Sequence, residues 1–441
     1  MSSMTASTAT ATKRRILFLS QAFPPLNPIA SVRSGNVAKY LTRLGWDVTV
    51  VCLDPSLVRP EFREIPAADL ERAEGKRIET SIELKFLLHG FLEGRTAGVA
   101  GLLSRLGRRL MHELDVDSGL GWVRPALAAC RRLQPGTVDL ILATGSPFMS
   151  FLVAERLARR LRCPYVLDYR DPWTDSPHRE SPSPFWVRRL ERALLRDAAA
   201  ATVVSPSWRE HLLAIDRSAK VTVVTNGFDP EVLASVPPWD FGGRPAIVYA
   251  GTFYPPKRVL APVLRALVRA RQEVPEIELH YFGPSDDLVR EEAAAVGAEG
   301  AVRCHGRVSQ ATSLMATKGA KMSVVVTSIL PEEKLVDRGI VTGKIFEAFG
   351  LRTPVLLVAP EGSDARTVVG SAGAGLSFSG DDISGMADAI VRAGRGESLC
   401  GFGGVNAYSW PVIARQLDEA LVQALPSTGG GHRGSTTRRP R

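Results

Sequence analysis

The segment at residues 343–364, GKIFEAFGLRTPVLLVAPEGSD, contains side chains whose types and spacing could bind a nucleotide. Lys344 and Glu347 open an expected helix that ends at Gly350, and an apolar strand at residues 354–358 follows. The start of such a helix presents free N–H groups and a positive dipole end, which suit a diphosphate. Lys344 adds a cation, and Glu347 can accept hydrogen bonds from two ribose hydroxyls. A nucleotide-sugar pocket needs these groups, but an ordinary i,i+3 surface pair is the alternative interpretation.

Length and composition bound the class of protein. The chain has 441 residues, of which 45% are hydrophobic and 23% charged, as expected for a globular protein of two or three domains. The net charge of +9 is compatible with nucleic acid, an acidic membrane surface or a polyanionic substrate. Because we find neither an RNA-binding aromatic signature nor helix-turn-helix punctuation, we expect no nucleic-acid partner.

The cysteines and the N-terminus indicate a reducing compartment. The five cysteines lie far apart and lack C-x-x-C spacing, so we expect neither a disulfide framework nor a zinc site. The Ser/Thr-rich start precedes only a short apolar strand, which argues against a secretory signal. No apolar run approaches the ~18–20 residues of a membrane span. We expect a cytoplasmic protein, either soluble or peripheral at the inner face of the membrane.

Two series of alternating apolar strands and helices predict two doubly wound α/β domains. In the first series we expect strands at 15–20, 47–52, 140–143, 165–168, 201–204 and 221–224, and helices at 36–44, 151–162 and 185–197. In the second series we expect strands at 246–250, 277–282, 301–304, 322–327 and 354–358, and a helix at 257–271 after a loop at 251–256.

The composition also predicts where the domains end. Residues 235–245, SVPPWDFGGRP, are rich in Pro and Gly and are typical of a linker. We expect a disordered start at 1–13, a first α/β domain at 14–234, a second α/β domain at 246–410, a helix at 411–424 that returns to the first domain, and a disordered tail at 425–441. Because ligands bind open α/β sheets at the carboxyl ends of the strands, we expect the site between the two domains.

Residues 99–134 include segments that are apolar on one face and arginine-rich on the other. Such a pattern suits a helix lying on an anionic membrane surface. It suits equally a helix whose apolar face is buried in its own domain. Both interpretations stay open, and peripheral membrane contact through 99–134 is one expectation.

A series of motifs in a fixed order resembles the family 4 glycosyltransferases. The motifs, spread over residues 13–423, are RILFLSQAFPP, SGNVAKYLTRLGWDVTVVC, PYVLDYRDPW, VVSPSWRE, VTVVTNGFDP, YAGTFYPPKR, GRVS and GKIFEAFGLRTPVL. The resemblance, closest to members that contain RDPW, implies a GT-B fold of two Rossmann-like parallel-sheet domains facing across a cleft. It implies a nucleotide diphosphate sugar as donor substrate, bound by the domain at 246–410, and a hydroxyl acceptor that can be lipid-linked, bound by the domain at 14–234. It also implies retention at the anomeric carbon. It implies no metal and no cofactor.

The resemblance also assigns candidate site residues. Without a metal, cations and N–H groups must stabilise the charge that a leaving diphosphate gains. The donor-binding candidates are Gly251, Thr252, Lys257, Arg258, Arg307, Lys344 and Glu347. The acceptor-side loop contributes Pro25, Ser31 and Arg33, and Arg170 and Asp171 are the candidates nearest the reacting centre. For Arg170 and Asp171 the alternative is an ion pair that only fixes their loop.

Three positions depart from the family pattern. The first of two glutamates spaced by seven residues is replaced by Gly339, and Asp337 is the candidate to take over its role. The Gly-Gly of the first loop is replaced by residues 27–30, NPIA, and the family's histidine falls at Arg170. These departures motivate a donor-binding scaffold without activity as one alternative. We interpret them instead as marks of a subfamily.

The leading hypothesis is transfer of a hexose-type sugar to a polysaccharide, glycolipid or cell-envelope glycan intermediate. The alternatives are glycosylation of a small secondary metabolite and a sugar-nucleotide epimerase on the same fold. An NAD(P) oxidoreductase would need G-x-G-x-x-G after a first strand, which neither domain supplies.

Overall fold

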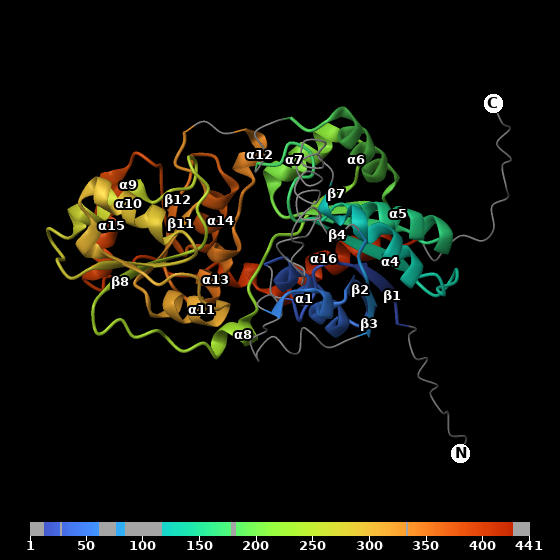
Figure 1. Ribbon diagram of the computed structural model, residues 1–441, viewed down its shortest axis with the longest axis horizontal. Helices are drawn as coiled ribbons and strands as arrows, with labels where there is room; N and C mark the ends of the chain where they lie inside the picture. Colours follow the sequence, from blue (N-terminus) through green and yellow to red (C-terminus); the bar gives the residue numbers. More distant parts are fainter. Residues whose placement is uncertain are drawn as a thin grey trace, which may run out of the picture.

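Two α/β domains lie side by side in the computed structural model, which describes residues 13–26, 29–60, 76–83, 117–177, 182–331 and 334–426 (Figure 1). Each domain is built on one parallel sheet, of seven strands in the first and six in the second. The predicted fold class of two doubly wound parallel-sheet domains is therefore confirmed. We call them the N-domain and the C-domain.

The N-domain sheet is buried on both faces. Along β1, Ile16 and Phe18 belong to one apolar cluster and Leu17 and Leu19 to another, because successive side chains point to opposite faces. The strand order is β3-β2-β1-β4-β5-β6-β7. The strands are β1 (Arg15–Leu19), β2 (Asp47–Leu53), β3 (Lys76–Thr80), β4 (Leu140–Gly145), β5 (Tyr165–Tyr169), β6 (Ala200–Val203) and β7 (Val221–Val223).

The C-domain sheet repeats this plan in the order β10-β9-β8-β11-β12-β13. Its strands are β8 (Ala246–Ala250), β9 (Glu278–Phe282), β10 (Val302–Cys304), β11 (Met322–Val326), β12 (Val355–Val358) and β13 (Gly375–Phe378). In both sheets the strand order reverses beside the first strand, between β1 and β4 and between β8 and β11. Open α/β sheets bind ligands outside the carboxyl ends of the strands at such switch points. Strands β3 and β13 are additional to those predicted.

Helices connect the strands. In the N-domain they are α1 (Ile29–Arg43), α4 (Val123–Ala129), α5 (Met149–Leu161), α6 (Phe185–Asp197), α7 (Pro206–Ile215) and α8 (Pro230–Ala234). Those after β8 are α9 (Ala261–Ala270), α10 (Asp286–Val296), α11 (Gln310–Gly319), α12 (Leu335–Arg338), α13 (Gly343–Leu351), α14 (Asp364–Ala372), α15 (Ile383–Gly394) and α16 (Trp410–Ala424).

Two predicted helix starts are wrong. The helix predicted from residue 36 begins at Ile29, because polar residues in its first turns satisfy their side chains within the helix: Ser34 donates to the carbonyl oxygen of Ala30, and Asn36 to that of Val32. The helix predicted from residue 257 begins at Ala261, because Tyr254 and Arg258 exchange two backbone hydrogen bonds that close residues 255–257 into a turn.

The chain crosses between the domains twice, and the two crossings are hydrogen-bonded to each other. The N–H of Phe228 donates to the carbonyl oxygen of Tyr408 at 3.0 Å, and the N–H of Trp410 donates to that of Phe228 at 2.9 Å. After the second crossing, α16 packs through Trp410, Ile413 and Leu417 into the N-domain cluster that contains the β1 side chains.

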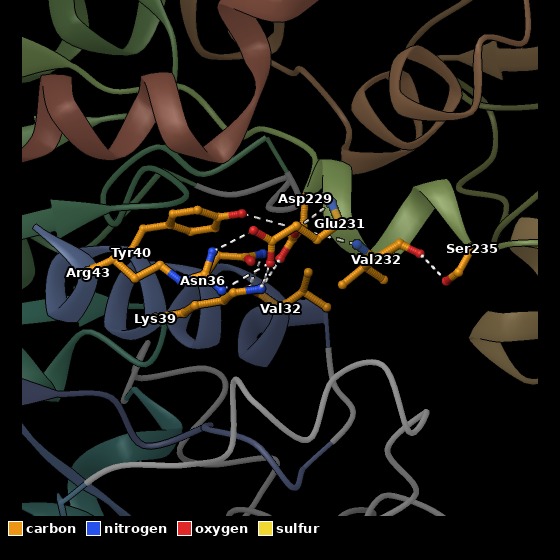
Figure 2. Close-up of polar contacts among 9 residues, drawn as sticks. All are labelled: Val32, Asn36, Lys39, Tyr40, Arg43, Asp229, Glu231, Val232 and Ser235. Carbon is orange, nitrogen blue, oxygen red and sulfur yellow. Dashed lines mark hydrogen bonds and ion pairs between the residues drawn. The ribbon is translucent and has the colours of Figure 1, made fainter.

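The first crossing is anchored by charge to α1, as Figure 2 shows. Lys39 Nζ lies 3.2 Å from Asp229 Oδ2 and 2.8 Å from Glu231 Oε2, and the Tyr40 hydroxyl donates to Asp229 Oδ1 at 3.1 Å. On the other side, Phe228 packs against Gly350 of α13 in the C-domain. This segment is therefore fixed to both domains.

Candidate functional site

The carboxyl edge of the C-domain sheet carries most of the predicted donor-binding residues. The loop after β8 holds Gly251, Thr252, Lys257 and Arg258, and α13 begins after the loop that follows β11. The N–H of Ile329, after β11, donates to the carbonyl oxygen of Lys257 at 2.8 Å and joins these two loops. The fold thus brings the predicted residues of both loops to one edge of the sheet.

Lys344 and Glu347 occupy the first turns of α13, where the sequence predicts them. Lys344 Nζ lies 2.9 Å from Glu347 Oε2, and Gln310 donates to Glu347 Oε1 at 3.3 Å. Their side chains are 32% and 23% exposed, so both can reach a ligand from solvent. The hydroxyl of Thr342, the N-cap of this helix, is buried and has no hydrogen-bond partner. The helix start therefore has free N–H groups beside a cation and a carboxylate, which suits an anion and a diol.

Lys257 and Arg258 lie in the loop after β8, Lys257 in a turn and Arg258 in the bridge that closes this turn. Lys257 Nζ forms an ion pair with Asp337 Oδ2 at 2.7 Å, and the other carboxylate oxygen of Asp337 is buried without a hydrogen-bond partner. The Arg258 guanidinium lies 5.0 Å from the centre of the Tyr254 ring, and its buried Nε has no partner. Both cations keep donors that a diphosphate could use.

Gly251 and Thr252 immediately follow β8. Their loop lies against the β9 loop so tightly that a Cβ atom on Gly283 would be 2.2 Å from the Gly251 carbonyl oxygen. Thr252 is exposed, and its own carbonyl oxygen accepts a long hydrogen bond of 3.4 Å from the Tyr249 hydroxyl. Only glycine at position 283 allows this close approach of the two loops.

Arg307 is exposed in the loop after β10. His305, two residues earlier, stacks on Phe282 with ring centres 4.2 Å apart, and its Nε2 lies 2.9 Å from Nδ1 of His280. Burial and the neighbouring His305 lower the pKa of His280 to about 4, and burial also lowers the pKa of His305. Neutral, stacked imidazoles beside an exposed arginine form a surface compatible with a nucleotide base.

Arg170 and Asp171 follow β5 in the N-domain. Arg170 is tied to the loop after β4: its guanidinium donates to the carbonyl oxygens of Gly145 and Ser146, at 3.0 Å for Gly145. Within the residues that the structure describes, no hydrogen bond or ion pair holds the Asp171 carboxylate. Arg170 therefore shapes the loop, while Asp171 is free to accept a proton or a hydrogen bond.

A buried network that the sequence did not predict supports this loop. Thr174, just after RDPW, donates its N–H and its hydroxyl to Glu191 Oε2 at 3.2 and 2.6 Å. His211 Nε2 of α7 lies 3.0 Å from the Thr174 carbonyl oxygen. Burial raises the pKa of Glu191 to about 7. A polar residue in an otherwise apolar face of α6 is the sequence signal that could have identified Glu191.

The three predicted acceptor-side residues differ in accessibility. Arg33 is buried and bonded: it contacts both carboxylate oxygens of Asp168, at 3.1 and 2.8 Å, and the backbone after β7. Although burial alone would raise the pKa of Asp168, the Arg33 guanidinium keeps it below its ordinary value. The hydroxyl of Ser31 is buried and lacks a partner, and Pro25 is half-buried. The structure places Arg33 in the domain interior.

The stretch at 99–134 is described from residue 117 onward, and 99–116 lie outside the described residues. Val123 and Ala126 of α4 are buried in the N-domain core. Trp122, immediately before α4, donates its Nε1–H to the hydroxyl of Thr80 at 2.6 Å. Asp117 caps the turn before α4 by accepting from the N–H of Gly119 at 2.8 Å. The apolar face of this helix is thus covered by its own domain.

Membrane-spanning helices and metal-binding clusters are both absent from the described ranges. Within them, no helix combines the length and apolar character needed to cross a bilayer. In the same residues, no group of three or more His, Cys, Asp or Glu side chains is arranged to hold a metal ion.

Known proteins share both domains. Residues 30–227 match the family described as glycosyl transferase 4-like domain, and residues 244–394 match glycosyl transferases group 1. The phosphatidyl-myo-inositol mannosyltransferase of Mycolicibacterium smegmatis is 27% identical over 227 residues, which are 49% of this chain and 55% of that protein. The chain thus spans about half the length of this curated relative.

Solved structures share the fold over nearly the whole chain. Sucrose-phosphate synthase from Thermosynechococcus elongatus superposes with a TM-score of 0.60 at 16% identity, covering 93% of this chain and 99% of that one. A glycosyltransferase from Rickettsia africae gives 0.59 at 14% identity, covering 95% and 100%. Anabaena HepE in complex with UDP and glucose gives 0.55 at 17% identity, covering 93% and 99%. Both halves of the molecule match this group, in sequence family and in fold: the chain belongs to the family 4 glycosyltransferases of the GT-B fold.

Proposed function

We propose that this enzyme transfers a hexose-type sugar from a nucleotide diphosphate sugar to a hydroxyl acceptor of a polysaccharide, glycolipid or cell-envelope glycan. The observation that carries the proposal is the carboxyl edge of the C-domain sheet, where Lys257, Arg258 and Lys344 accompany the free start of α13. These groups stabilise a diphosphate that gains charge as it leaves. The lipid substrate named for the mannosyltransferase relative favours an acceptor presented at a membrane, which suits a cytoplasmic enzyme peripheral at its inner face.

The proposed reaction retains the configuration at the anomeric carbon. The acceptor hydroxyl attacks the face that the diphosphate leaves, the C–O bond to the phosphate breaks as the new one forms, and the proton passes to the departing phosphate oxygen. In this scheme the enzyme contributes positioning and electrostatics. Asp171, which has a free carboxylate among the described residues, can instead take the proton and contribute roughly 10²–10⁴-fold. Three cations with available donors support a reaction that needs no metal and no cofactor.

A screen for the donor tests this proposal directly. Thermal shift against a panel of UDP-, GDP- and ADP-sugars should reveal one that raises the melting temperature, with and without EDTA. Incubation of that sugar with candidate acceptors, followed by NMR of the product, reports the anomeric configuration. A product of inverted configuration, or a requirement for a divalent ion, would contradict the corresponding part of the proposal.

The same screen separates the alternatives. A sugar-nucleotide epimerase would convert the nucleotide sugar without any acceptor, whereas a transferase would at most hydrolyse it. An inactive scaffold would bind the nucleotide sugar and yield neither product. A small-metabolite transferase would glycosylate small-molecule acceptors and leave lipid-linked ones unmodified.

A further inference from the structure

The first turn of α7 reaches from the N-domain into the C-domain, beside α12 (Figure 1). It belongs to the motif VVSPSWRE, to which the proposed reaction assigns no role. Trp208 Nε1 donates to the carbonyl oxygen of Val336 at 2.7 Å. Ser207 donates its N–H and its hydroxyl to the two carboxylate oxygens of Asp364, at 2.8 and 3.1 Å. Ser207 and Trp208 lie in the first turn of α7, which follows β6, and Asp364 begins α14, which follows β12. The carboxyl edges of the two sheets therefore face each other here.

Trp208 also fills the space next to Gly339. A Cβ atom at residue 339 would lie 2.1 Å from Cδ1 and 2.2 Å from Nε1 of the indole ring, distances at which atoms overlap. No residue larger than glycine therefore fits while Trp208 is docked. This contact gives a steric reason for glycine at the position where the family pattern predicts a glutamate.

The segment that Trp208 contacts, α12 and the residues after it, is too short to be stable by itself. The helix α12 has four residues, and a single helical turn is unstable unless other parts of the protein support it. Val336 is buried, and Ile340 packs against the apolar core of the N-domain. This part of the C-domain chain is thus supported by the N-domain.

The same segment carries Asp337, the partner of Lys257. Asp337 is buried, its Oδ2 pairs with Lys257 Nζ at 2.7 Å, and its Oδ1 has no hydrogen-bond partner. A buried carboxylate oxygen without a partner is costly, so a donor group from a ligand would stabilise it. Displacement of α12 would move this carboxylate and release Lys257.

The next turn of α7 contacts the N-domain loop with the reacting-centre candidates. His211, one turn after Trp208, bonds to the carbonyl oxygen of Thr174, which follows Arg170 and Asp171 in the same loop. One helix therefore touches both the loop of Asp171 and the segment of Asp337.

We infer that Trp208 is a positioning residue through which the N-domain completes the donor site: docked on Val336 and Gly339, it holds Asp337 and Lys257 where the sugar diphosphate binds. The inference rests on the proposed function, because it concerns the same nucleotide sugar. The inference predicts different effects on the binding of two ligands, the nucleotide sugar and the nucleoside monophosphate. The monophosphate has neither the second phosphate nor the sugar, so its binding should not depend on Lys257 or Asp337.

The test compares Gly339→Ala, Trp208→Ala and Trp208→Phe with the wild type by calorimetry. The probes are the nucleotide sugar selected in the thermal-shift panel and the matching nucleoside monophosphate. Gly339→Ala and Trp208→Ala should weaken binding of the nucleotide sugar about tenfold, and Trp208→Phe, which keeps a ring but loses the N–H donor, a few-fold. The monophosphate should bind all variants equally. Trp186→Ala, at a more exposed tryptophan on α6, is the matched control and should change neither affinity.

Hydrogen exchange of the 334–342 peptide supplies a second measurement that requires no ligand. Exchange should become faster in Gly339→Ala and Trp208→Phe and stay unchanged in Trp186→Ala. Folded variants that bind the nucleotide sugar as tightly as the wild type would overturn the inference alone, as would equal weakening of both ligands. A wild-type protein that binds no nucleotide sugar would overturn the proposed function and the inference with it.

Discussion

The charged pairs at the carboxyl edges of the two sheets differ in burial and in number of partners. In the N-domain, the Arg33 and Asp168 side chains are 4% and 3% exposed, and each Asp168 oxygen accepts two hydrogen bonds, from Arg33 and from a threonine. In the C-domain, Lys344 and Glu347 share one contact and are several times more exposed. A closed, buried pair maintains the fold, whereas a half-exposed pair can exchange its partner for a ligand at little cost.

The largest expected effect comes from opening the buried pair. Arg33→Met leaves Asp168 as a buried carboxylate without a cation and should reduce the free energy of unfolding by about 3–5 kcal/mol, measured by urea denaturation. Arg15→Met is the control, because its pair with Asp139 is more than 30% exposed on both sides and should contribute less than about 1 kcal/mol. If Arg33→Met were as stable as the control, the distinction between the two kinds of pair would fail.

Next in size is the removal of the C-domain cations. Lys257→Gln combined with Arg258→Gln removes two charges but keeps a hydrogen-bond donor near Asp337, so kcat should fall about 10²–10³-fold. The melting temperature should change little. The double variant Arg265→Gln and Arg269→Gln, on the exposed face of α9, removes the same charge and should leave kcat unchanged. Normal turnover in the first double variant would contradict the phosphate assignment.

Glu191 and Asp168 are both buried carboxylates of the N-domain, but Glu191 is held by Thr174 and Asp168 pairs with the cation Arg33. Its pKa is raised to about 7 in the folded protein from 4.5 in the unfolded chain. Between pH 4.5 and 7 the folded state therefore holds the extra proton, and the free energy of unfolding should fall as pH rises, by up to about 3 kcal/mol. Asp168, whose pKa is lowered, should act in the opposite sense as the pH falls.

Urea denaturation at several pH values checks this expectation. Glu191→Gln should remove the decline between pH 4.5 and 7 and leave other pH dependence in place. An identical pH profile in the variant and the wild type would show that Glu191 does not titrate in this range.

The smallest expected effect concerns the half-exposed pair itself. Glu347→Ala should weaken nucleotide-sugar binding by about 1–3 kcal/mol, because hydroxyl groups of the ligand lose their acceptor. The fold should be unaffected. Glu397→Ala, from an exposed pair with Arg392, is the control. Calorimetry with equal affinities for Glu347→Ala and the wild type would exclude Glu347 from the site.

Most strands could be predicted from the sequence because the inner strands of both sheets are buried on both faces and are therefore mainly apolar. Strand β3, KRIET, lies at a sheet edge and is mostly exposed or half-buried, so it lacks this pattern. The start of α1 could not. Ser31, Ser34 and Asn36 favour turns on local grounds, and the helix extends back to Ile29 through side-chain hydrogen bonds and the tertiary pair of Arg33 with Asp168. Strand β13 is short and only half-buried, so its pattern is weak.

The contacts of the candidate site also include some that the sequence predicts and others that it does not. Lys344 and Glu347 lie on one helix, where their spacing alone predicts a contact, and the structure has that contact. Lys257 and Asp337 are far apart in the sequence, and no local pattern predicts their ion pair. Gly339 looks like a lost glutamate in the sequence, and only the distant Trp208 explains it.

The paired crossings at Phe228 and Ser409 have a mechanical consequence. A single connecting segment lets two domains rotate freely about it. Two segments that are hydrogen-bonded to each other form a short ribbon, which bends in one plane and resists twisting. Relative motion of the two domains should therefore follow one angular path. Since α16 follows the second crossing directly and covers one face of the N-domain sheet, cutting the chain there would also expose an apolar core.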